Sequence, residues 1–313
     1  MRDEQIHSSG MRQWHERVLT GASVERRSIE VPGHGLVHVL DTGAGPPLVL
    51  IHGSGVAAGL FLPLLEELQG IRAVAPDRPG TGLSDPVDFP LERYHESTSA
   101  WVDRLLDALD LGAVALLGHS AGGVLALRYA LARPERVERL VLVGPPALPG
   151  TRCPLPYRLM RTPGLGALLS SVPATQKSVL RFAKFMGEDS SLATRPELVD
   201  LFVAAGRDRL TQSALTAEVR VLVSRAALVS RSGWQRESQV RPDELRRLSM
   251  PTLLIWGECE PLGSVAVAQQ VTDLIPDGRL AVLPGGHAPW LGEPARTAAA
   301  VASFVRTSPA IAA

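Results

Sequence analysis

The sequence predicts an α/β fold: a mostly parallel sheet flanked by helices, with a block of helices inserted into it. Short apolar runs alternate with stretches of helical periodicity between residues 47 and 143, the pattern of a parallel sheet with helices on both faces. This alternation stops after Gly144-Pro145-Pro146 and resumes at residue 251. The intervening residues show helical periodicity, broken by prolines and glycines, and no convincing strand.

The chain begins with an arm and a hairpin. The first 20 residues are polar and aperiodic, and we expect a loose or weakly helical arm there. Residues 24–31 and 36–41 alternate in polarity around the turn 32–35, which indicates an antiparallel hairpin.

Continuous apolar runs predict the buried strands, and periodic segments between them predict the helices. Further strands are expected at residues 47–51, 72–76, 113–118, 140–143, 251–257 and 279–283. Helices of the sheet domain are expected at residues 60–68, 97–109, 121–131, 264–275 and 290–306. We therefore predict one sheet domain made of residues 1–145 and 246–313, with residues 146–245 as a helical insertion.

Composition points away from several classes of protein. The chain has 313 residues, of which 45% are hydrophobic, and its 32 basic residues balance 32 acidic ones. Without a basic excess or a charged tail, we expect a small, weakly charged molecule as the partner, and neither nucleic acid nor a membrane. The oligomeric state stays open.

The cysteines suggest a reducing compartment, and the apolar runs suggest neither secretion nor a membrane span. Cys153 and Cys259 lack the spacing of metal ligands or of a disulfide framework, so they imply neither a zinc site nor a disulfide. We expect no metal and no cofactor. Residues 1–7 have no apolar secretion signal, and no apolar run is long enough to span a bilayer. We expect a cytoplasmic protein.

A serine turn carries the chemistry. Gly118-His119-Ser120-Ala121-Gly122 lies directly between a predicted strand and a predicted helix. Glycines two before and two after the serine suit a sharp turn, because a side chain at either place would collide with the neighbouring strand or helix. Such a turn lifts the hydroxyl of Ser120 clear of the sheet, which predicts a nucleophile.

An activated serine needs a base, and His287 is the candidate. It lies in the loop after the last predicted strand, and parallel strands place such loops on the same edge of the sheet as Ser120. His119 precedes the serine and is expected to point away from it. His95 is held in reserve, and the remaining histidines fall in the arm, the hairpin or the loop at residue 52.

The acid that orients this base is expected in the loop after strand 251–257. Glu260 is the first choice and Glu258 the second, because the imidazole needs a carboxylate within reach of the nitrogen that faces away from the serine. For the oxyanion hole, the turn itself supplies the backbone N–H of Ala121. The loop after strand 47–51 should supply a second N–H, from Ser54 or alternatively from Gly55.

Four segments together resemble the α/β-hydrolase superfamily. They are residues 52–55, 77–84, 118–122 and 286–290. The order serine, acid, histidine along the chain is also that of the family. The resemblance extends over residues 24–306 and implies an α/β-hydrolase fold in which residues 146–245 form the helical cap. We interpret residues 77–84 as a structural loop beside the pocket.

The resemblance implies a serine hydrolase that forms an acyl-enzyme on Ser120. We expect this hydrolase to cleave an ester, thioester or lactone of a small, largely apolar substrate. The alternatives are the same triad acting on another bond, as in a C–C hydrolase, aminopeptidase, perhydrolase or acyltransferase, or a ligand-binding member of the fold without turnover. One departure stands out: Glu260 occupies the place where the family usually has aspartate, although some relatives use glutamate.

Overall fold

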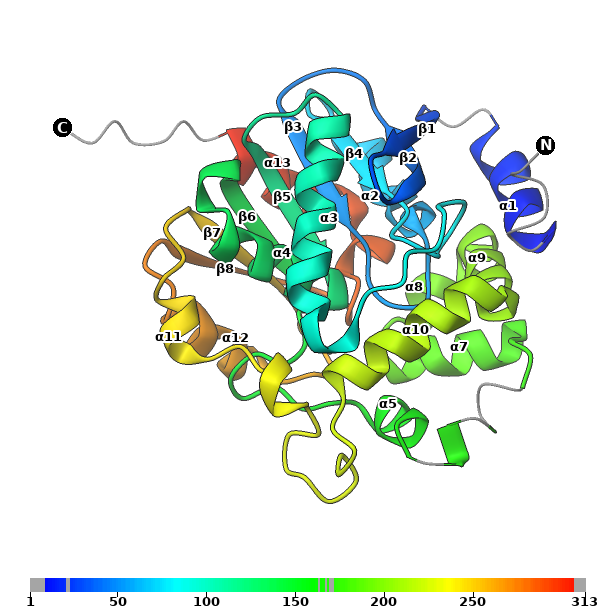
Figure 1. The fold of residues 1–313 in the computed structure, drawn as a ribbon, viewed down its shortest axis with the longest axis vertical. Helices are drawn as coiled ribbons and strands as arrows, with labels where there is room; N and C mark the ends of the chain where they lie inside the picture. Colours follow the sequence, from blue (N-terminus) through cyan, green and yellow to red (C-terminus); the bar gives the residue numbers. More distant parts are fainter. Residues whose placement is uncertain (1–8, 21–22, 163, 167, 169–171, 307–313) are drawn as a thin grey trace.

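The fold is built on a single eight-stranded sheet (Figure 1). The structure is a computed structural model that describes residues 9–20, 23–162, 164–166, 168 and 172–306. Along the sheet the strands run in the order β1-β2-β4-β3-β5-β6-β7-β8. Their bounds are β1 Glu25–Val31, β2 Gly35–Asp41, β3 Pro47–Ile51, β4 Arg72–Pro76, β5 Val114–His119, β6 Val137–Val143, β7 Thr252–Gly257 and β8 Gly278–Leu283.

The sheet is mostly parallel, as predicted. Strand β2 pairs antiparallel with β1 and with β4, which confirms the hairpin. Every other neighbouring pair is parallel. Strands β3 and β5 lie in the middle of the sheet and are buried almost throughout, which explains why they are continuous apolar runs rather than alternating ones.

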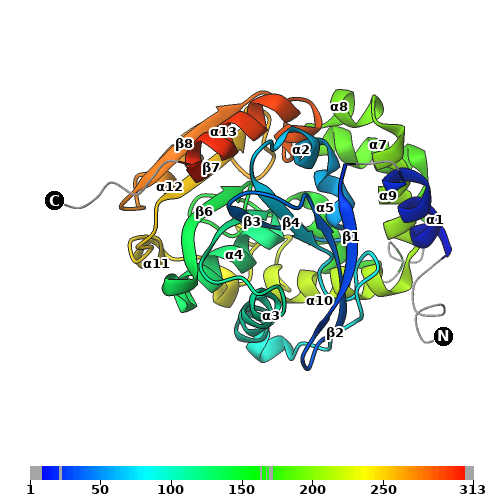
Figure 2. The same ribbon diagram turned by 90° about the horizontal axis from the view of Figure 1, so that it is seen from above.

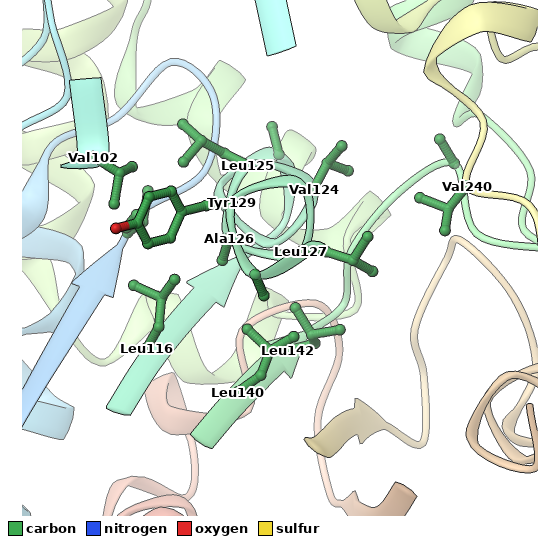
Figure 3. Packing of buried hydrophobic residues seen from close by; sticks show 14 of the residues in the cluster. Val102, Leu116, Val124, Leu125, Ala126, Leu127, Tyr129, Leu140, Leu142 and Val240 are labelled. Atoms are coloured by element: carbon green, nitrogen blue, oxygen red, sulfur yellow. The ribbon is translucent and has the colours of Figure 1, made fainter. Parts of the chain in front are cut away.

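Helices cover both faces of the sheet (Figure 2). One face packs against α3 (Tyr94–Ala108), α4 (Ala121–Ala132) and α12 (Val265–Thr272), and the other against α2 (Leu62–Glu67) and α13 (Pro294–Arg306). Successive strand residues alternate between the two cores, as the pleat requires. Figure 3 shows Leu116 of β5 and Leu140 and Leu142 of β6 pointing toward the side chains of α4. This packing fixes the start of α4, where Ser120 lies.

The N-terminal segment is not a loose arm. Its described part forms α1 (Ser9–Leu19), while residues 1–8 of the predicted arm lie outside the described residues. Met11 and Trp14 are buried, and a Cβ at Gly59 would lie 2.2 Å from the Trp14 ring. The Nε1–H of Trp14 donates to the carbonyl of Glu197, at 2.6 Å. Of the two alternatives in the prediction, the helical one is correct for the described part of the arm. The prediction did not include its burial, because few of its residues are apolar and their partners are distant in sequence.

The segment between β6 and β7 is helical, as predicted, and we refer to residues 146–245 as the cap segment. Its helices are α5 (Leu155–Met160), α7 (Gln176–Phe185), α8 (Asp189–Ala193), α9 (Pro196–Arg207), α10 (Arg209–Leu222) and α11 (Pro242–Leu245). Its described residues contain one isolated β-bridge, between Val223 and Trp234, and no strand. Among the helices that the structure describes, none is long and apolar enough to cross a membrane.

Candidate active site

Ser120 lies at the apex of the turn between β5 and α4. Its backbone has φ +54° and ψ −127°, a left-handed conformation that is strained for a residue with a side chain. The flanking glycines are required by close contacts. A Cβ at Gly118 would lie 2.4 Å from the carbonyl oxygen of Gly122, and a Cβ at Gly122 would lie 2.3 Å from the carbonyl oxygen of Ile51. The local sequence thus forces the turn that presents the Ser120 hydroxyl.

His287 and Glu260 form a buried pair next to this turn. The Nδ1 of His287 lies 2.9 Å from both carboxylate oxygens of Glu260, and each residue is 7% exposed. The Glu260 carboxylate also accepts the backbone N–H of Leu262, at 3.1 Å. Glu258 is exposed, so of the two predicted acids the structure brings only Glu260 to the histidine.

Glycine at position 144 makes room for this pair. Its φ is +52°, and a Cβ there would lie 2.6 Å from Oε2 of Glu260 and 2.9 Å from Nδ1 of His287. Gly144 follows β6 directly, so the edge of the sheet is shaped to accept the longer glutamate side chain. The chain therefore accommodates Glu260 without losing contact with the imidazole.

The surroundings favour the charged form of His287. Burial disfavours the imidazolium, but the charge of Glu260, its hydrogen bond and the charge of Glu188 together raise the pKa of His287 above its ordinary value. A hydrogen bond from Nδ1–H to Glu260 would leave Nε2 as the acceptor on the opposite side of the ring. That is the tautomer that a general base toward Ser120 needs.

The predicted oxyanion donors lie on the two loops that meet at Ser120. Ala121 begins α4, so its N–H has no partner within the helix. Ser54 and Ala121 line a common cavity with Ser120 and His287, whereas Gly55 lines a neighbouring cavity with Arg78 and Glu218. This placement favours Ser54 over Gly55 as the second donor.

A buried ion pair secures the loop that carries Ser54. Arg78 follows β4, Glu218 lies on α10 of the cap segment, and both are buried. Glu218 accepts hydrogen bonds from the guanidinium of Arg78, from Ser54 Oγ at 2.5 Å and from the Tyr94 hydroxyl at 3.2 Å. Arg78 also donates to the carbonyl of His52, at 3.3 Å. The sheet domain and the cap segment are thus joined beside the candidate oxyanion hole.

His119 and His95, the other two histidines considered as candidates, have structural partners. His119 Nε2 lies 3.1 Å from the carbonyl oxygen of His287, and burial together with the nearby His287 charge lowers the pKa of His119 well below its ordinary value. It therefore supports the His287 loop as a neutral side chain. His95 Nε2 lies 3.2 Å from Ser238 Oγ, away from Ser120. Neither competes with His287 as the base.

Two small cavities, of about 70 and about 30 Å³, share Ser120 and His287 in their walls. Ser54, Tyr157 and Met186 also line both. The larger cavity is otherwise mainly apolar, with Val56, Leu60, Val179, Phe182, Leu192, Phe202 and Leu291 among its lining residues. An open groove of about 920 Å³ lies between residues 79–91 and α10 and contains none of the candidate catalytic residues.

Three acidic and basic residues at this site were not predicted: Glu188, Glu218 and Arg78. The pattern of α10 carried a signal for one of them. Glu218 lies on the same helical face as the buried Thr211 and Leu222, and an acidic residue on an apolar face indicates a buried partner. That partner, Arg78, lies 140 positions away in the sequence.

One group of side chains has the composition of a metal site. Potential ligand atoms of His15, His38 and Asp77 lie within 4.8 Å of one another. The Asp77 carboxylate, however, accepts the N–H groups of Ala58 and Leu83, at 2.7 and 3.0 Å, and lies 2.9 Å from His38 Nδ1. These bonds anchor the start of loop 77–84, in agreement with its predicted structural role.

The fold and this geometry match a known family. A family profile described as alpha/beta hydrolase fold matches residues 46–294. The chain belongs to the α/β-hydrolase family, whose members similar to this chain include esterases and a dienoate hydrolase.

Three relatives illustrate the range of proteins to which this chain is similar in sequence. The chain is 34% identical over 282 residues to the polyketide synthase ThaQ of Burkholderia thailandensis, covering 87% of this chain and 12% of ThaQ, so it spans about an eighth of that relative. It is 29% identical to the pimeloyl-[acyl-carrier protein] methyl ester esterase of a Shewanella species (82% of this chain, 89% of the relative). It is 27% identical to the 2-hydroxy-6-oxo-6-phenylhexa-2,4-dienoate hydrolase of Burkholderia cepacia (81% and 86%).

Among solved structures, the carboxylesterase CesB of Bacillus subtilis superimposes with a TM-score of 0.74. The two sequences are 22% identical, and the match covers 95% of this chain and 97% of CesB. At this identity the likeness is one of fold.

Proposed function

We propose that the protein is a serine hydrolase that cleaves an ester, thioester or lactone through an acyl-enzyme on Ser120. The observation that carries this proposal is the placement of Ser120, on its strained turn, in the wall of the same cavity as His287, whose Nδ1 lies 2.9 Å from Glu260. A serine nucleophile, a histidine base and a carboxylate that orients the base are the three parts that such chemistry requires.

In the proposed mechanism, His287 Nε2 takes the proton of the Ser120 hydroxyl while Oγ attacks the carbonyl carbon of the substrate. The imidazolium that forms is stabilised by Glu260, and the backbone N–H groups of Ala121 and Ser54 bind the oxyanion. The imidazolium then protonates the leaving group. Water, activated by the same histidine, hydrolyses the acyl-enzyme and restores the Ser120 hydroxyl.

The lining of the cavities supports a largely apolar substrate without a negative charge. No arginine or lysine belongs to the described walls of the two cavities at Ser120. A carboxylate on the substrate would lose its hydration there without gaining a cationic partner. An uncharged acyl group is therefore favoured over a dienoate.

We further propose that residues 146–245 act as the cap of a sheet domain made of residues 1–145 and 246–313. The support is that cap-segment residues Tyr157, Phe182, Met186 and Phe202 form walls of the larger cavity. The cap would then select the acyl group by shape.

A C–C bond hydrolase is the second candidate. It is supported by the Burkholderia cepacia relative, which is named a dienoate hydrolase. The Ser120, His287 and Glu260 of this chain could serve that chemistry as well. Detectable cleavage of a dienoate, with no turnover of neutral esters, would favour it over the esterase.

Labelling with a fluorophosphonate probe tests the nucleophile. We expect the wild-type protein to be labelled and Ser120→Ala not to be. Ser213→Ala, at an exposed serine on α10, is the matched control and should be labelled like the wild type. A folded wild-type protein that resists the probe would contradict the proposal.

A panel of p-nitrophenyl esters, lactones and acyl thioesters then identifies the bond and the acyl group. Because the cavity beside Ser120 is small, about 70 Å³, against the roughly 300 Å³ or more of most ligand pockets, we expect kcat/KM to be higher for butyrate than for decanoate esters. The relative named a pimeloyl-[acyl-carrier protein] methyl ester esterase justifies adding methyl esters of carrier-protein-bound acyl groups to the panel.

A further inference from the structure

The loop that carries His287 is held by the cap segment. Three consecutive backbone N–H groups of this loop donate to residues 186–188: the N–H of His287 to the carbonyl of Met186, at 3.0 Å, and those of Gly286 and Ala288 to Oε1 of Glu188, at 2.9 and 2.7 Å. One carboxylate oxygen therefore bridges the residues on either side of His287.

Glu188 is itself held in place. Its other oxygen, Oε2, accepts the hydroxyl of Ser191 at 2.8 Å, and the residue is only 4% exposed. The carboxylate binds the backbone of the His287 loop, whereas Glu260 binds the imidazole. The two acidic residues thus have different parts of the same loop as partners.

Two glycines bring the cap segment against the loops of His287 and Glu260. Gly187 has φ +78°, and a Cβ there would lie 2.8 Å from the carbonyl oxygen of Cys259. A Cβ at Gly286 would lie 2.1 Å from the carbonyl oxygen of Met186. Side chains at these positions would force the two backbones apart, so the contact requires glycine at both positions.

We propose that Glu188 is a positioning residue of the active site: it fixes the loop of His287 from the cap segment, and its buried charge favours the imidazolium that forms during turnover. This inference rests on the proposed function, because it needs His287 to act as the base. Although burial disfavours the imidazolium, the pKa of His287 is raised by nearby negative charge, to which Glu188 contributes after Glu260. His119 also packs against this imidazole, with ring centroids 4.8 Å apart, and burial lowers the pKa of His119 so that it stays neutral.

Glu188→Gln separates the charge from the hydrogen bonds. The glutamine oxygen can accept both N–H groups and its amide can donate to Ser191, so the loop keeps its partners while the negative charge is lost. We expect the acidic limb of the pH profile of kcat/KM to move to lower pH by about half a unit or more. We also expect kcat to fall roughly three- to tenfold, because the lost charge no longer stabilises the imidazolium in the transition state.

Glu237→Gln is the matched control, because it removes the same charge from an exposed position of the cap segment. Its pH profile and kcat should equal those of the wild type. A purely structural role of Glu188 would lower the midpoint of urea unfolding without moving the acidic limb. A Glu188→Gln protein with the wild-type acidic limb would therefore overturn the inference.

Glu188→Asp provides a second test if the glutamine variant does not fold. It keeps the charge but withdraws the carboxylate by one methylene, about 1.5 Å, so kcat should fall while the acidic limb stays near its wild-type position. An unchanged kcat would overturn the inference. If the wild-type protein is not labelled by the fluorophosphonate, the proposed function itself fails; if it is labelled and turns over, a failure of these variants concerns Glu188 alone.

Discussion

At the scale of single residues, Glu260 tests the proposed triad most directly. Replacing it by glutamine removes the charge that stabilises the His287 imidazolium, and we expect kcat to fall by about a thousandfold or more. Glu258→Gln is the control, because Glu258 lies in the same loop but is exposed. Steady-state kinetics on an ester of the panel measure both. Retained turnover in Glu260→Gln, with loss in Glu258→Gln, would show the assignment to be wrong.

The pH dependence of kcat/KM follows from the environment of His287. Although burial disfavours the imidazolium, Glu260 and Glu188 raise the pKa of His287 above 6.5. Only the neutral imidazole can accept the Ser120 proton, so activity should fall as the pH drops through this raised value. The midpoint of the acidic limb is expected above pH 6.5, measured between about pH 5 and 9. A midpoint below 6.5 would contradict the role of these charges.

At the scale of elements, the turn between β5 and α4 depends on Gly122. In Gly122→Ala the new methyl group would lie 2.3 Å from the carbonyl oxygen of Ile51, so β3 and α4 must separate. We expect a loss of at least about 3 kcal/mol in the free energy of unfolding. Gly112→Ala is the control: nothing lies within 4 Å of its Cβ, and a change within about 0.5 kcal/mol is expected. Urea denaturation measures both, and equal midpoints would count against the tight turn.

Helix α1 offers a second test at this scale. Trp14 fills the space over Gly59 and binds the carbonyl of Glu197, so Trp14→Ala should lower the free energy of unfolding by about 3–5 kcal/mol. Gln13→Ala, at the neighbouring exposed position, should leave it nearly unchanged. If thermal unfolding shows the two variants to be alike, α1 does not pack as described.

These elements also show what the sequence could predict. The strands and most sheet-flanking helices were predictable, because each depends on a short local pattern such as residues 47–51. The turn at Ser120 was predictable from its flanking glycines. The order of the strands brought the His287 loop and the loop after β7 to one edge, but it did not decide between Glu260 and Glu258. The tight packing of α1 could not be predicted, because its few apolar residues find their partners at Gly59 and in α9. Glu188 was missed for the same reason, since its partners lie 98 and 100 positions away.

At the scale of the whole molecule, the Arg78–Glu218 pair joins the sheet domain to the cap segment. Glu218→Gln leaves the buried guanidinium without a counter-charge, and we expect it to lower the free energy of unfolding by about 3–5 kcal/mol. The double variant Arg78→Met/Glu218→Leu should cost less than the sum of the single changes, because it leaves no unpaired charge. Urea denaturation of Arg78→Met, of Glu218→Leu and of the double variant gives the coupling between the two charges.

The matched control for this pair is Arg93–Glu96, which lies on the surface. Glu96→Gln should change stability little, since exposed ion pairs are screened by water. Strict additivity between Arg78 and Glu218 would show that the two charges do not act as a pair.

The contacts of Glu188 and Glu218 have a consequence for how such a chain can be recombined. One fold can host many functions, because function depends on the site built on it. A new site could be sought here by exchanging residues 146–245. Here the exchanged piece would also remove the acceptors for the His287 loop and for Ser54 Oγ. A chimaera that imports a foreign segment without acidic side chains at positions 188 and 218 would inherit the serine turn intact but leave its neighbours unsupported. An exchange of this segment would therefore have to keep those two carboxylates.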